Sequence, residues 1–324
     1  MTALASLFAA EAPTVGIEIG ARHVTVVRLA PGHGPAAVVS LAVEPLAAGA
    51  VVPALNEPNI RDRSAVSAAV ARALEQAGAR RRQAVLVVPD TVGRVSLLRF
   101  EKVPERPADL VELIRWQTRK SVPFRVEDAQ LTFTPTGPDD STGEFAVVLA
   151  RRDIVAEYES ICAEQGVQIG IVDLATFNLI NASVAAGNAP DGDWLLVNAA
   201  GDYLSLAILR GGRLLFFRHR GSEGEDSLED VVHQTAMYYE DRLSGTGFSR
   251  VVLASAGRES GEPDPGAAAD AGLVRRQLEQ RLSVRVDSVD PRPAITLADR
   301  ISIQPTLLDA LAPALGLLLR ERAA

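Results

Sequence analysis

Lysine and cysteine are both scarce in this chain of 324 residues. Its only lysines, among 33 basic residues, are Lys102 and Lys120, and neither follows a glycine. A phosphate loop of the G-x-x-x-x-G-K type is therefore excluded. The single cysteine, Cys162, excludes an internal disulfide and is most simply a core residue. The four histidines show no metal-ligand spacing with one another or with Cys162, so we expect no metal site.

Long apolar runs and a positive net charge are also absent. No run of about 18 apolar residues occurs, and the N-terminus lacks a basic segment followed by a long apolar one. We therefore predict neither a membrane span nor a signal peptide, and a cytoplasmic protein. The net charge of -8 opposes a general attraction to nucleic acid, so no nucleic-acid partner is expected. Residues 1–13 form an N-terminal tail, interpreted as a frayed terminus that contains a short apolar piece.

The first half of the chain, residues 14–193, reads as an α/β domain with an insertion. Three strands, a helix from Ser64 as N-cap, and a fourth, fully apolar strand are expected at 15–19, 24–29, 37–43, 64–77 and 84–88. The rhythm then changes over about 94–150, where a strand, a helix ended by Pro123 and two further strands suggest a small inserted α+β subdomain. A helix, a strand and another helix close this half.

The second half, residues 194–324, repeats the same order of elements. A three-strand meander is followed by a helix, a strand, a helix and a short strand, and an apolar helix over 306–320 ends the chain. Such a repeat predicts two related α/β domains that face each other across a cleft. Whether the 306–320 helix packs back on the first domain stays open at this point.

The stretch from Val15 to Leu29 carries the clearest chemical signal. It reads as two apolar strands joined by a turn that contains Gly20, with Glu18 near the end of the first strand. In nucleotide-binding folds built on such hairpins, backbone N–H groups in the turn hold phosphates, and the carboxylate orients a hydrated metal ion.

This duplication, headed by Gly16-Ile17-Glu18-Ile19-Gly20, resembles the actin, Hsp70 and hexokinase superfamily, whose domains are RNase H-like. Within it the chain is similar to the PilM family of type IV pilus assembly proteins. Three further patterns support the resemblance: the helix from Trp116 into the Val-Pro-Phe turn at Phe124, the start of a helix at 173–177, and an apolar stretch at 314–320. The resemblance implies an inserted subdomain placed as in FtsA, ATP in the cleft, and binding of the cytoplasmic N-terminal tail of the membrane protein PilN.

The second phosphate hairpin departs from the pattern of these families. Asn198 stands where an acid is usual, and Ala200 where a glycine is usual, while the loop that would lie along the adenosine keeps only Gly257. Three acids in the loop at 221–227 would also oppose a triphosphate. We therefore expect no catalytic residue and no metal-binding set, and either no cofactor or weak binding of ATP with magnesium. The residues assigned to this residual nucleotide cleft are Glu18, Gly20, Ala21, Asn198, Gly201 and Gly257.

Two further groups of residues carry a functional interpretation. Asp173 is a candidate general base, although its place at a predicted helix start favours a capping role. Trp116, Val122 and Phe124 are candidates for contact with a partner, because a small inserted subdomain has little core of its own. At least two of these three are expected to pack onto the main body.

The sequence therefore predicts a PilM-like cytoplasmic scaffold that is peripheral to the inner membrane. Its expected partners are the tail of a PilN-like protein, in a groove beside the inserted subdomain, and other components of pilus assembly or a related secretion system. Self-association is left open. The alternative function is an actin-like ATPase or a small-molecule kinase.

Overall fold

The structure is a computed structural model. It describes residues 12–32, 34–79, 83–137, 143–187, 191–221, 228–254, 265–298 and 305–323. The predicted tail at 1–13 lies almost wholly outside these ranges, as do the acidic loop at 222–227 and Gly257.

The first sheet has six strands in the order β14-β3-β2-β1-β4-β8. Its strands are β1 (Val15–Ile19), β2 (His23–Leu29), β3 (Ala36–Pro45), β4 (Gln83–Val88), β8 (Gln168–Leu174) and β14 (Ile295–Leu297). The three N-terminal strands form the predicted antiparallel meander, whereas β4, β8 and β14 join it in parallel. The expected strands at 15–19, 24–29 and 84–88 are confirmed, but β14 was not expected.

Helices cover both faces of this sheet. The helices α1 (Arg63–Gln76) and α3 (Arg152–Glu164) pack on the face that presents Val15, Ile17 and Ile19. The C-terminal helix α7 (Pro305–Ala323) packs on the opposite face, against residues of β2 and β4. Apolar runs with little alternation fit this arrangement, because a strand covered on both faces needs apolar side chains on both. The predicted N-cap Ser64 is wrong: Asp62 caps α1 and accepts a hydrogen bond from the N–H of Ala65 at 2.9 Å.

The second sheet repeats the strand order of the first as β11-β10-β9-β12-β13. Its strands are β9 (Asp193–Ala200), β10 (Tyr203–Arg210), β11 (Arg213–Gly221), β12 (Arg250–Ala254) and β13 (Val286–Ser288). Again a three-strand antiparallel meander is followed by parallel strands. The helices α5 (Leu228–Leu243) and α6 (Pro265–Leu282) contribute to the core on one face, and α4 (Ala175–Ala185) covers the other.

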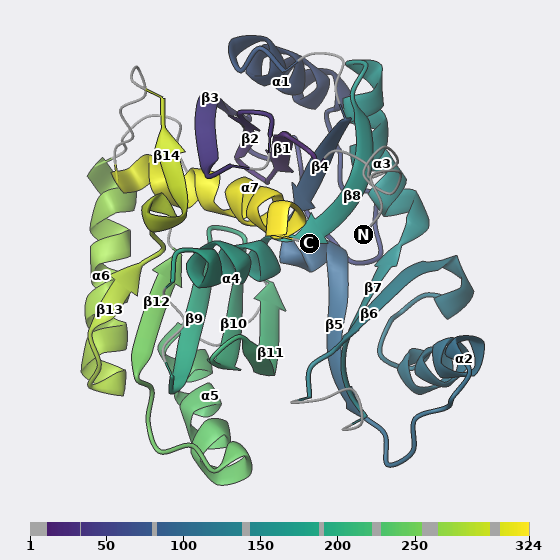
Figure 1. The fold of residues 1–324 in the computed structure, drawn as a ribbon, viewed down its shortest axis with the longest axis vertical. Helices are drawn as coiled ribbons and strands as arrows, with labels where there is room; N and C mark the ends of the chain where they lie inside the picture. The colour runs from purple at the N-terminus through teal and green to yellow at the C-terminus, as the bar shows by residue number, and fades with distance from the viewer. Residues whose placement is uncertain are drawn as a thin grey trace.

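The helices α4 and α7 lie against each other between the two sheets (Figure 1). Their crossing depends on glycine: a Cβ at Gly316 would lie 1.8 Å from the carbonyl oxygen of Asn178. Gly16 on β1 allows a similar approach, since a Cβ there would lie 2.9 Å from the carbonyl oxygen of Ala314. The last helix of the chain thus joins the first sheet to the helix that covers the second.

A third, three-stranded antiparallel sheet in the order β5-β7-β6 extends away from the first (Figure 1). Its elements, with the short 3-10 turns beside them, are η1 (Asp90–Val92), β5 (Gly93–Arg99), α2 (Pro107–Thr118), η2 (Val126–Asp128), β6 (Ala129–Pro135) and β7 (Glu144–Arg151). One more short turn, η5 (Arg292–Ala294), precedes β14.

This small sheet and α2 have a core of their own, which the sequence did not lead us to expect. Buried Val122 and half-buried Phe124 belong to this separate cluster, with Leu110, Ile114 and Phe145, and not to the core of the main body. The expectation that at least two of the three candidate partner residues pack on the main body is therefore wrong. The helix also ends at Thr118, well before Pro123.

Candidate functional site

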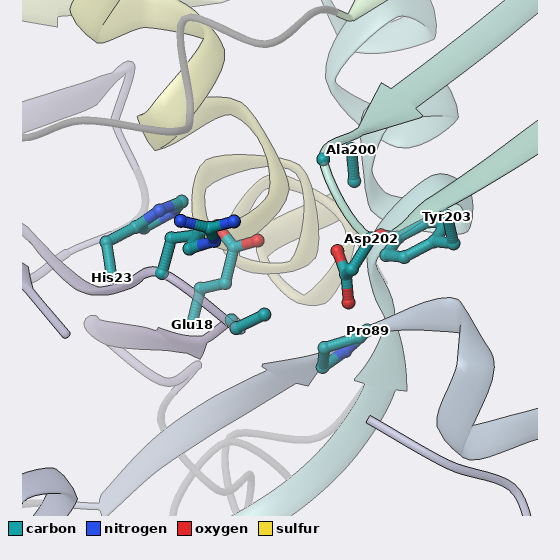
Figure 2. Close-up of a pocket in the computed structure, with 10 residues that line it drawn as sticks. Glu18, His23, Pro89, Ala200, Asp202 and Tyr203 are labelled. Carbon is teal, nitrogen blue, oxygen red and sulfur yellow. The ribbon is translucent and has the colours of Figure 1, made fainter. Parts of the chain in front are cut away.

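The turns of the β1–β2 and β9–β10 hairpins meet at a small cavity (Figure 2). Its lining residues are Glu18, Gly20, Ala21, Arg22, His23, Pro89, Ala200, Gly201, Asp202 and Tyr203. The structure thus brings together four of the six residues assigned to the nucleotide cleft. Asn198 is not among the lining residues, and Gly257 lies outside the described ranges.

The volume of this cavity is about 30 Å³. That is room for about two water molecules, since one water needs roughly 10–15 Å³ of such space. A drug-sized ligand needs roughly 300–1,000 Å³. The space that the described residues of the two hairpins enclose is therefore by itself smaller than a site for ATP.

Glu18 and Asp202 bring two carboxylates to the cavity. Glu18 is almost fully buried near the end of β1, and Figure 2 shows its carboxylate and that of Asp202 pointing into the space between the two hairpins. Arg22 and His23 add basic groups to the same lining. Two carboxylates close to a phosphate would repel it unless a cation lay between them. Within the described ranges, no group of three or more His, Cys, Asp or Glu side chains could hold a metal ion.

Asn198 belongs to a buried network that joins the two halves of the chain. Its side-chain amide donates to the hydroxyl oxygen of Thr176 at 2.9 Å and to that of Tyr203 at 3.2 Å. Thr176, on α4, donates in turn to Asp90: its backbone N–H lies 2.9 Å from one carboxylate oxygen, and its hydroxyl contacts the other. Asn198, Thr176 and Asp90 are fully buried. The residue that replaces the usual acid therefore holds η1, α4, β9 and β10 together.

The network continues along the second sheet to His219. The Nδ1 atom of His219 lies 3.0 Å from the hydroxyl oxygen of Ser205, and its ring lies 5.3 Å from that of Tyr203. Burial lowers the pKa of His219; the Asp90 carboxylate opposes this shift and Arg94 adds to it. Burial also raises the pKa of Tyr203 well above its usual value. Both side chains are therefore neutral at neutral pH.

Sequence reasoning missed most of this network. Asp90, Thr176, Tyr203 and His219 were not singled out, and Asn198 was assigned to the nucleotide. The available signal was Asp90, a carboxylate only two residues after a fully apolar strand.

Asp173 is neither a base in the cavity nor a helix cap. It is in β8, does not line the cavity, and precedes Leu174, which is the N-cap residue of α4. Its carboxylate accepts from the N–H of Leu174 at 2.8 Å and from Nη1 of Arg320 on α7 at 2.5 Å. Burial raises the pKa of Asp173, and Arg320 opposes that shift. The capping interpretation is therefore wrong, and the side chain serves to fix α7.

A larger depression of about 460 Å³ lies beside the small sheet. Its lining residues are Phe124, Asp128, Arg151, Arg152 and Asp153. Arg151 pairs with Asp153, and the hydrogen bond from its guanidinium lowers the pKa of the Asp153 carboxyl. Arg151 also donates to the backbone oxygen of Asn56 at 2.9 Å. Arg152 is exposed and forms no ion pair with any residue that the structure describes. We call this depression the Phe124 groove.

The three candidate partner residues thus separate in space. Val122 is buried, Phe124 lines the groove, and Trp116 on α2 keeps 58% of its surface exposed. Within the described ranges, none of the helices combines the length and apolarity that crossing a bilayer requires.

Comparison with known proteins gives one family match and several structural matches. The sequence model of a family described as type IV pilus assembly protein PilM matches residues 16–243. The structure is similar to that of a PilM-PilN type IV pilus biogenesis complex, with a TM-score of 0.78, 19% identity, and coverage of 97% of this chain and 99% of that chain. It is also similar to the cytoplasmic domain of EpsL, an inner membrane component of the type II secretion system of Vibrio cholerae, with a TM-score of 0.50, 9% identity, and coverage of 95% and 93%.

At these identities the structural likeness shows the fold alone, and it confirms the duplicated actin-like α/β fold predicted from the sequence. The family match carries the identity, because it covers more than half of the 324 residues. This chain therefore belongs to the PilM family of type IV pilus assembly proteins.

Proposed function

We propose that this chain is a cytoplasmic scaffold of the pilus assembly complex that binds the N-terminal tail of a PilN-like membrane protein in the Phe124 groove. The structural relative with the TM-score of 0.78 is a complex of PilM with PilN. The observation that carries the proposal is the groove itself. It joins an apolar side chain, Phe124, to an exposed cation, Arg152, between the small sheet and the first domain.

The groove also leads to a sheet edge that pairs with no further strand among the residues that the structure describes. Strand β6 is at one end of the order β5-β7-β6, and it begins at Ala129, directly after the groove residue Asp128. An extended peptide can add to such an edge, since the edge strand has backbone N–H and C=O groups without a partner strand. The main-chain bonds would give affinity, and Phe124 and Arg152 would give specificity.

The test is isothermal titration of the full chain with the N-terminal tail peptide of a PilN-like protein from the same organism. Phe124→Ala should weaken binding by about tenfold, because a central aromatic contact is lost. Arg152→Ala should weaken it by a smaller factor. The matched control is Arg242→Ala, which removes an exposed arginine from α5 in the other half. No binding by the parent chain, or equal loss in the control, would count against the groove.

We further propose that partner binding does not depend on ATP turnover. The small volume of the cavity and the use of Asn198 in a buried network both support this. Titration with ATP and magnesium should give no saturable heat. Tight binding with turnover that disappears in Glu18→Ala would overturn the proposal and favour the ATPase.

The same proposal implies where the chain is located and which proteins it assembles with. A partner anchored in the inner membrane would hold the chain at the cytoplasmic face of that membrane, together with other assembly components. Deletion of the partner gene should shift most of the chain out of the membrane fraction. Light scattering on the purified chain measures whether a second copy associates.

A further inference from the structure

The helix of the small subdomain carries an exposed tryptophan. Trp116 is 58% exposed on α2, which lies at the edge of the molecule in Figure 1. The only other tryptophan, Trp194, is fully buried, and its ring N–H donates to the carbonyl oxygen of Gly211 at 2.8 Å. An aromatic ring of this size in water is costly, so an occupant that covers it is favoured.

The charge around Trp116 is opposite in sign to that of the whole chain. Four basic residues and no acidic residue occur over 113–125, whereas the chain as a whole has a net charge of -8. These basic residues are Arg115, Arg119, Lys120 and Arg125. The Arg119 guanidinium lies 5.5 Å from the ring centroid of Trp116, and Arg119 and Lys120 are exposed.

Acidic neighbours reduce this charge only in part. Arg115 lies 3.8 Å from Glu112, and Arg125 lies 3.7 Å from Glu127. Arg119 and Lys120 form no ion pair within the described residues. We call Trp116, Arg119, Lys120 and Arg125 the α2 tip. It combines one exposed aromatic ring with two basic side chains beside it that are not neutralised.

The chemistry of the α2 tip fits a membrane surface better than a protein groove or peptide. Tryptophan rings favour the headgroup level of bilayers, where lysine and arginine meet anionic lipids. Trp116 is in the last turn of α2, Arg119 and Lys120 follow that turn directly, and all three side chains are exposed. A flat bilayer can contact exposed side chains without a cleft. We propose that the α2 tip is a docking surface for the headgroups of anionic phospholipids. The contact is a property of the chain itself and does not require the partner tail.

The test uses Trp116 as its own reporter, since Trp194 is shielded in the core. The full chain is mixed with vesicles of phosphatidylglycerol and phosphatidylcholine, or of phosphatidylcholine alone, at low salt. The expected result is a blue shift of tryptophan emission, and quenching by brominated lipid, with the anionic vesicles only. Higher salt should reverse both effects, because it screens the charges.

Variants then place the contact. Arg119→Glu with Lys120→Glu should abolish sedimentation with anionic vesicles, and Lys120→Ala alone should reduce the partition coefficient by about fivefold. Trp116→Phe should remove the emission change and the quenching. Arg242→Ala serves again as the control and should bind like the parent. Thermal unfolding of each variant checks that these exposed changes leave the fold intact.

Three results would overturn the proposal: no binding to anionic vesicles, equal binding to neutral ones, or binding that survives the double charge reversal. Binding of an acidic peptide such as polyglutamate at the α2 tip, without binding of vesicles, would also overturn it and indicate a protein partner. Because no tail peptide is present in the vesicle experiment, a negative result there does not bear on peptide binding in the Phe124 groove. A negative peptide titration likewise does not bear on lipid binding by the α2 tip.

Discussion

Asn198 connects the two halves of the molecule through one of its two donated hydrogen bonds, the one to Thr176. Its amide reaches Thr176 on α4 and Tyr203 on β10, and Thr176 reaches Asp90 beyond. An amide can donate to both hydroxyl oxygens, whereas a carboxylate can only accept. A carboxylate at position 198 would also be separated from the Asp90 carboxylate only by the Thr176 side chain, and the two negative charges would repel each other. Asparagine at position 198 thus suits a buried hydrogen-bond network between the two halves, whereas an acid there would suit a metal site.

Asn198→Asp should therefore destabilise the fold. The variant loses both donated bonds and gains a buried carboxylate, and such a loss costs about 2–4 kcal/mol in the free energy of unfolding. Urea denaturation at pH 7.5 measures it. The variant should partly recover at acidic pH, where protonation of the new carboxyl restores a donor. A variant as stable as the parent that gains ATP binding would contradict this role of Asn198.

His219 predicts a dependence of stability on pH. Its folded pKa lies below the ordinary value of 6.5, so the unfolded chain takes up this proton at a higher pH than the folded chain does. The contribution to stability is fully present above pH 6.5 and is lost as the pH falls through the folded pKa. We expect the urea midpoint of the parent to fall more between pH 7.5 and pH 5 than that of His219→Gln. Parallel curves for the two proteins would refute this.

Among the elements, the crossing of α4 and α7 leaves the least room for change. Gly316 brings α7 against the carbonyl of Asn178, and Asn178 is itself fixed because its side chain donates to the carbonyl oxygen of Leu174 at 2.8 Å. The neighbour is backbone, which cannot move aside as a side chain can. Any Cβ at 316 must push the two helices apart.

Gly316→Ala should lower the free energy of unfolding by about 3 kcal/mol or more, despite the better helix propensity of alanine. The matched control is Gly272→Ala on α6, where the nearest atom to the new Cβ is the flexible end of Arg276 at 3.5 Å. That change should be neutral or stabilising by up to about 1 kcal/mol. Thermal unfolding of both variants decides, and equal Tm values would contradict the close approach.

Element boundaries show where local sequence stops being informative. Ser64 and Asp62 are equally good capping types two residues apart, and only the folded chain shows that Asp62 accepts the hydrogen bond of the first turn. Strand β14 is three residues long and pairs with β3 from the far end of the sequence. A pattern that short has no readable period, so no local signal announced it.

For the whole molecule, the first sheet depends on the end of the chain. Helix α7 covers Val27, Leu29, Val85 and Val87, and Arg320 ties it to Asp173. The division of the sequence at about residue 193 therefore does not give a first half with a complete core. We propose that residues 14–193 fold stably only together with residues 305–323.

Deletion of residues 305–324 should leave an uncovered apolar face, because β2 and β4 are apolar on that side. The truncated chain should aggregate or bind the dye ANS strongly, and it should unfold without a sharp transition. Size exclusion, dye binding and calorimetry test this. Adding residues 305–324 back as a peptide should lower dye binding. A monomeric truncation with a cooperative transition would contradict the dependence.

The sequence by itself determined the duplicated fold, because strand periodicity, the turn at Gly20 and the repeated order of elements are local signals that recur in both halves. It also determined that the second hairpin lacks the usual acid and glycine. Only the tertiary structure decided what Asn198 does instead, that Val122 and Phe124 pack within the small subdomain while Trp116 stays outside, and that α7 completes the first sheet. These depend on contacts between residues tens or hundreds of positions apart, where side-chain volume and hydrogen-bond partners, and not local propensity, set the free energy.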